Sequence, residues 1–160
     1  MPMADVDHKS LAISLNQRTW TLLEKGDRSA AESDEMIHAA HGSLWHWLQA
    51  GGPVQQQRGE WLIGRVYVVL GFCEAALRHA NRTMDLTDRH LDVLQDFDLA
   101  YAHELLARAL EMAGETGRAL DMWNKALELG TRIAGPKDRE IFEGDLKAIE
   151  FQPACASLTD

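Results

Sequence analysis

Hydrophobic residues recur at helical spacing along almost the whole chain, and the pattern is broken at regular intervals by glycine and proline. Apolar positions three and four residues apart form one face of an α-helix, so each unbroken stretch predicts one helix. The predicted helices span residues 11–23, 34–50, 53–70, 72–89, 97–113, 116–133 and 136–149. The sequence therefore predicts an all-α fold of about seven helices.

Helix ends are marked by residues that begin or stop a helix. Ser33 and Asp96 are expected N-caps, because their side-chain oxygens can accept a hydrogen bond from the first turn. Pro53 and Pro136 suit the first turn, where a missing amide hydrogen costs nothing. Gly71 and other glycines provide the breaks.

The stretch 53–70, which contains RGEWLIGRVYVVL, is apolar nearly all round and is therefore expected to be buried. Its charged residues Arg58, Glu60 and Arg65 are expected to be buried with it, and such groups need partners. The β-branched run at 66–69 permits a strand, but helical periodicity on both sides favours a helix.

An internal repeat appears when the chain is shifted by 43 residues, which aligns Arg65 with Arg108, Gly71 with Gly114 and Ala76 with Ala119. Each copy reads as helix, glycine break and second helix, which is a helical hairpin. The segment 105–130, LLARALEMAGETGRALDMWNKALELG, resembles one tetratricopeptide repeat (TPR). The resemblance implies antiparallel hairpins in a TPR-like right-handed array.

A second resemblance covers most of the chain. The motifs HW, RGEW, RVY and AALRHA, in that order within 41–79, are similar to those of an uncharacterised bacterial family of TPR-like proteins. This resemblance implies a fold and no particular activity.

Composition narrows the function classes. The 160 residues carry 25 acidic and 16 basic side chains, a formal charge of -9 without a basic cluster, which disfavours nucleic acid as a partner. We find neither a secretory signal nor the ~20 apolar residues that span a bilayer, and so expect a cytoplasmic protein without membrane contact. One domain is expected over 1–151, with a flexible tail at 152–160.

Arg58, Trp61 and Arg65 share one helix face, at spacings of three and four residues. Two like charges on a buried face need an anion between them. That anion is either an internal carboxylate or a bound carboxylate or phosphate group, for which arginine is well suited. The internal candidates are Glu60, Glu74, Asp96, Asp98 and Glu104.

Histidines form the other candidate chemistry. His38, His41 and His46 fall within nine residues, and Glu35 with His38 has the spacing of a di-iron ligand pair, but no second Glu-x-x-His motif occurs. Histidines that are satisfied by hydrogen bonds are the simpler interpretation. We predict no metal and no cofactor.

Three functions follow as hypotheses. The first is a non-catalytic helical-repeat scaffold that binds a protein or peptide partner, or a second copy of the chain. The second is a binder or sensor of a small anionic metabolite, with a site formed by His41, His46, Arg58, Glu60, Trp61, Arg65 and Tyr67. The third is a metal-dependent enzyme with His38, His41 or His46 as metal ligands and Glu60 as the acid or base.

Overall fold

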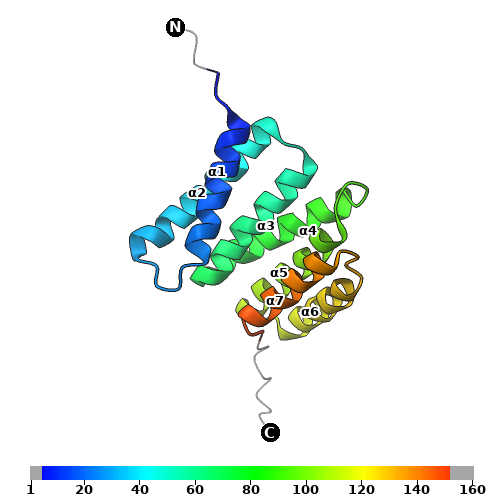
Figure 1. Cartoon of the computed structure of the whole chain (residues 1–160). Coiled ribbons are helices and arrows are strands. Elements are labelled where there is room, and N and C mark those ends of the chain that lie inside the picture. Colours follow the sequence, from blue (N-terminus) through cyan, green and yellow to red (C-terminus); the bar gives the residue numbers. More distant parts are fainter. Residues whose placement is uncertain (1–4, 152–160) are drawn as a thin grey trace.

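The computed structural model describes residues 5–151 and consists of packed antiparallel helices (Figure 1). The helices are α1 (His8–Leu23), α2 (Ala30–Ala50), α3 (Pro53–Leu70), α4 (Cys73–Arg89), α5 (Asp96–Met112), α6 (Thr116–Thr131) and α7 (Pro136–Ala148). Within these residues there are seven helices and no strand, which confirms the all-α prediction. The predicted tail at 152–160 lies outside the described residues.

Consecutive helices pack as hairpins: α1 with α2, α3 with α4, and α5 with α6 (Figure 1). Helix α7 lies against α5 and α6, and α3 also contacts α5 directly. Each junction has its own apolar cluster. Met36 and Ile63 belong to the cluster of α1, α2 and α3, Leu105 and Leu110 to that of α4, α5 and α6, and Phe142 to that of α5, α6 and α7. Every hairpin is therefore held by its neighbours, as in a helical-repeat protein.

The 43-residue repeat is visible in the two turns that it predicts. Gly71 and Gly114 both adopt positive φ, at 80° and 76°, a conformation that glycine reaches without a steric penalty. The amide of Phe72 donates to the Tyr67 carbonyl, and the amide of Glu115 donates to the Leu110 carbonyl, both at 2.9 Å. The same hydrogen bond thus closes two helices at equivalent positions.

Both predicted N-caps were wrong. Ser29, rather than Ser33, caps α2: its hydroxyl accepts from the Glu32 amide, and the Glu32 carboxylate accepts from the Ser29 amide. This reciprocal pair needs a glutamate three residues after the cap, and Ser33 has none. The cap of α5 is Gln95, and Asp96 instead accepts a hydrogen bond from the Ala134 amide in the turn before α7.

Close packing of α6 and α7 depends on Gly130. A Cβ atom added there would lie 2.5 Å from Cε1 of the buried Phe142. Gly130→Ala is expected to lower the free energy of unfolding by about 1–3 kcal/mol, because the ring must move out of a packed core. Gly144 in α7 has no such neighbour within 4 Å. Gly144→Ala should raise stability by about 0.5–1 kcal/mol, since alanine is the better helix residue. Urea denaturation of both variants measures the contrast, and equal effects would contradict the packing argument.

Candidate functional site

Arg58 is bound by an internal carboxylate. Its Nε and Nη2 donate to the two oxygens of Asp98 at 2.8 and 2.9 Å, and its guanidinium lies 5.0 Å from the Phe97 ring centre. Asp98 is 4% exposed, but 45% of the Arg58 side chain is accessible, so the expectation that Arg58 is buried was wrong. Arg58 belongs to the second turn of α3, and its side chain reaches the rim of a cavity.

Arg65 is bound by Glu104, another of the five candidate carboxylates. Arg65 Nη1 lies 3.4 Å from Glu104 Oε1, and the same oxygen accepts a short hydrogen bond from Arg108 Nε. Glu104 is 1% exposed and Arg108 2% exposed. Two guanidinium groups therefore share one buried carboxylate, and of the two alternatives for the anion, both Arg58 and Arg65 have the internal carboxylate.

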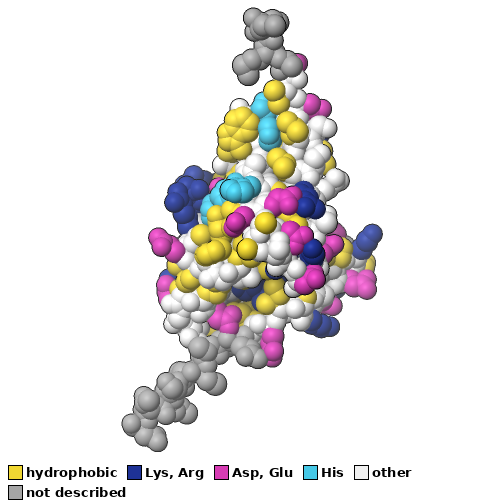
Figure 2. Space-filling model, turned by 90° about the vertical axis from the view of Figure 1, so that its left-hand side faces the viewer, with side chains coloured by type: hydrophobic (Ala, Val, Ile, Leu, Met, Phe, Trp, Pro, Cys, Tyr) yellow, Lys and Arg dark blue, Asp and Glu magenta, His cyan; other side chains and the backbone are white. Residues whose placement is uncertain are grey.

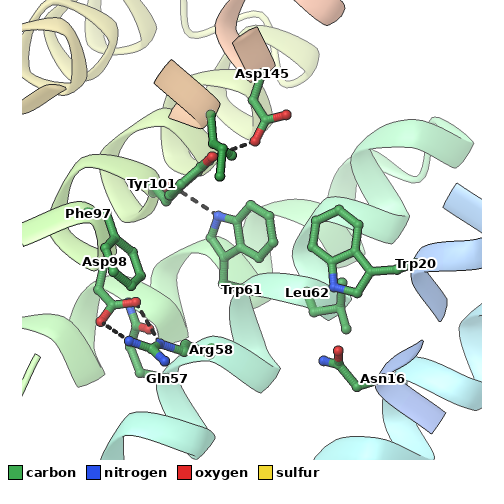
Figure 3. Close-up of a pocket in the computed structure, with 11 residues that line it drawn as sticks. Asn16, Trp20, Gln57, Arg58, Trp61, Leu62, Phe97, Asp98, Tyr101 and Asp145 are labelled. Carbon is green, nitrogen blue, oxygen red and sulfur yellow. Dashed lines mark hydrogen bonds and ion pairs between the residues drawn. The ribbon is translucent and has the colours of Figure 1, made fainter. Parts of the chain in front are cut away.

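A cavity of about 330 Å³ lies beside Arg58 and Trp61 and is drawn in Figure 3. We call it the four-helix cavity, because only α1, α3, α5 and α7 contribute to its wall. Its lining residues are Asn16, Trp20, Gln57, Arg58, Trp61, Leu62, Phe97, Asp98, Tyr101, Ile141 and Asp145. Each hairpin contributes its first helix to this cavity, and α7 completes it.

Aromatic rings form the wall of the four-helix cavity. Trp20 and Trp61 stack with ring centres 6.0 Å apart, and Trp61 meets Tyr101 edge-on at 5.3 Å. The Trp61 indole N–H donates to the Tyr101 carbonyl at 3.2 Å, which holds the ring in place (Figure 3). The predicted site residue Trp61 therefore lines this cavity and also packs against the core.

Tyr101 joins this wall to α7. Its hydroxyl donates a short hydrogen bond to Oδ2 of Asp145 (Figure 3). Burial raises the pKa of Tyr101 well above its usual range, and the hydrogen bond to Asp145 raises it further. The hydroxyl therefore stays protonated and acts as a donor, and Asp145 is left as an acceptor.

The predicted residues His41, Glu60 and Tyr67 lie at a different cavity, of about 960 Å³, between α2, α3 and α4. We call it the histidine cavity, since His41 and His79 both line it. His41 Nε2 lies 3.0 Å from the Tyr67 hydroxyl, and Glu60 Oε2 lies 2.6 Å from His79 Nδ1. Figure 2 shows histidine side chains (cyan) on one face of the molecule, with hydrophobic side chains (yellow) and charged side chains (dark blue and magenta) beside them.

Protonation of His41 is disfavoured in the folded chain. Burial lowers the pKa of His41 most, and the neighbouring His79 lowers it further. His79 also stacks on Tyr67, with ring centres 5.7 Å apart. His79 was not among the predicted site residues; the AALRHA motif placed it on α4, but only the packing of α4 against α3 brings it to Glu60.

His46 lies at neither cavity. Its Nδ1 is 2.8 Å from Nδ1 of His8, at the start of α1. Trp45, the neighbour of His46 in the sequence, packs against both histidine rings and is 56% exposed. The seven predicted site residues are thus distributed over the four-helix cavity, the histidine cavity, the Glu104 ion cluster and the His8 contact.

Residues 5–151 have neither a metal-ligand cluster nor a membrane-spanning helix. That part of the chain contains no group of three or more His, Cys, Asp or Glu side chains that could hold a metal ion. It also contains no helix that is both long and apolar enough to cross a membrane.

Comparison of the chain with protein-family models, with curated proteins and with solved structures finds no match. The resemblance to TPR proteins therefore depends on the residues and on the observed hairpins.

The carboxylate of Glu104, shared by two arginines, leads to a prediction about stability. Glu104→Gln leaves Arg65 and Arg108 without their common anion, and we expect a loss of about 3–5 kcal/mol in the free energy of unfolding. Arg65→Leu should cost less, because Glu104 keeps Arg108 as a partner. Urea denaturation at pH 7 measures both. The control is Glu128→Gln, in a fully exposed ion pair on α6, which should change little. A Glu104→Gln variant as stable as the control would contradict the buried-network account.

Proposed function

We propose that the chain is a non-catalytic, TPR-like binding module that takes a protein or peptide segment, or a segment of a second copy, along the surface that contains the four-helix cavity. The observation that carries the proposal is that the residues lining the cavity come from one helix of each hairpin and from α7. In helical-repeat arrays the equivalent helices of successive repeats line a shared concave surface, which is the usual binding surface. We further propose that it acts in the cytoplasm.

The chemistry of the wall suits a peptide partner. Trp20, Trp61 and Tyr101 offer large, rigid surfaces of the kind that dominate the energy of protein interfaces. Trp20 is 37% exposed, so part of its ring is open to a partner. Arg58 is already neutralised by Asp98, which favours contacts through apolar and hydrogen-bonding groups over capture of a free anion.

Selection from a displayed library of random dodecapeptides tests the proposal. We expect the wild-type chain to retain specific peptides, and Trp20→Ala to weaken their binding at least roughly tenfold, the loss typical of an interface tryptophan. The matched control is Trp45→Ala, which removes an exposed indole from the other cavity. Thermal melting checks that both variants fold. The proposal fails if no peptide is retained, or if both variants bind as the wild type does.

A second candidate function is the binding of a small anionic metabolite at the histidine cavity. Arg58 and Arg65 both have carboxylate partners, so we place this ligand away from the Arg58/Trp61/Arg65 stripe. The supporting observation is Arg78, which lines the histidine cavity and forms no ion pair with any residue of 5–151.

Phenyl phosphate is a suitable probe, because it combines an anion with an aromatic ring for the apolar wall. We expect it to raise the melting temperature of the wild type and to have less effect on Arg78→Gln, which removes the unpaired guanidinium. Arg89→Gln is the control, since Arg89 is an exposed arginine of the same helix outside this cavity. Equal shifts in all three proteins would show that binding does not use Arg78.

A further inference from the structure

The two carboxylates of the four-helix cavity differ in their partners. Asp98 accepts two hydrogen bonds from Arg58 and one from the Gln95 amide, so its charge is balanced. Asp145 accepts only the neutral Tyr101 hydroxyl and has no cationic partner among residues 5–151. The charged residues of the lining, Arg58, Asp98 and Asp145, therefore leave one negative charge in excess.

The aromatic wall is the second feature of the cavity that bears on its ligand. Trp20 and Trp61 stack on one side of the cavity, and Tyr101 packs against Trp61 (Figure 3). The faces of tryptophan and tyrosine attract cations, and the attraction grows as the cation loses water. An anion would meet the excess negative charge, which disfavours it.

We propose that the four-helix cavity receives an alkylammonium group, the lysine side chain of a bound peptide. Its aliphatic arm packs on Trp20 and Trp61, and its ammonium donates to Asp145. The formal charge of -9 attracts such a basic segment at long range. That the ammonium belongs to a peptide rests on the proposed function; the preference of the cavity for a cation does not.

Three probes of equal chain length separate charge from shape: n-pentylammonium, the neutral 1-pentanol and the anionic pentanoate. Binding is followed in ¹H–¹⁵N spectra through the indole N–H signals of Trp20 and Trp61. We expect n-pentylammonium to bind at least roughly tenfold more tightly than 1-pentanol, from cation–π attraction and a charged hydrogen bond, and pentanoate not to bind.

Asp145→Asn tests the assigned residue, because it removes the charge and keeps the shape. It should remove most of the preference for n-pentylammonium over 1-pentanol, because only the cation–π attraction of the tryptophan rings remains. Glu143→Gln is the matched control: it removes one charge from an exposed position of the same helix, outside the cavity, and should leave the preference intact. The inference is overturned if the three probes bind alike, if none binds, or if both variants lose the preference equally.

The peptide selection keeps this inference distinct from the proposed function. Peptides that depend on Trp20 but carry no enriched lysine, together with no ammonium preference, refute the inference and leave the peptide function standing. Ammonium binding that depends on Asp145, with no peptide retained, supports the cation site and refutes the peptide function.

Discussion

Two buried carboxylates of α5 join the second hairpin to the third, Asp98 through Arg58 and Glu104 through Arg65. Glu104 on α5 binds Arg65 from α3 and Arg108 from its own helix. In a helical-repeat array each hairpin contacts only its neighbours, so the relative position of two hairpins is decided at their junction. An apolar junction alone tolerates sliding, whereas a buried charge has few positions at which its hydrogen bonds are made. The direct contact of α3 with α5, and hence the spacing of Trp61 and Tyr101, depends on this cluster together with the Arg58–Asp98 ion pair.

The repeat explains why two arginines meet at one carboxylate. Arg65 and Arg108 occupy equivalent positions, 43 residues apart. Arg65 binds Glu104 in the next hairpin. Arg108 binds Glu104 in its own helix and also donates to the Ile149 carbonyl just after α7. The Arg108 guanidinium also lies 5.2 Å from the Trp123 ring centre. Equivalent residues therefore make different contacts, because α7 follows the third hairpin where a further complete repeat would otherwise lie.

Much of the fold could be predicted from the sequence, because helix periodicity and glycine breaks are local signals. Gly71 and Gly114 marked two turns correctly, and Pro53 and Pro136 marked two helix starts. For the partners of Arg58 and Arg65, the sequence offered five acidic residues and could not choose among them. A contact between residues about 40 positions apart depends on how two helices cross. Trp20 was missed as a wall residue for the same reason: its own helix carries no sign that α1 approaches α3 at Trp61.

The division of the predicted site follows from the geometry of α3 itself. Successive residues of an α-helix advance by about 100°, so residues three and seven apart return to one face. Glu60, Ile63 and Tyr67 form one such set and line the histidine cavity. Arg58 and Trp61 form another and line the four-helix cavity. A single helix that is apolar nearly all round thus serves two cavities on different faces, and the charged residues within it are divided according to the neighbour that each face meets. Proximity in sequence grouped these residues, but the helix separates them, so ligands of different chemistry can be assigned to each face independently.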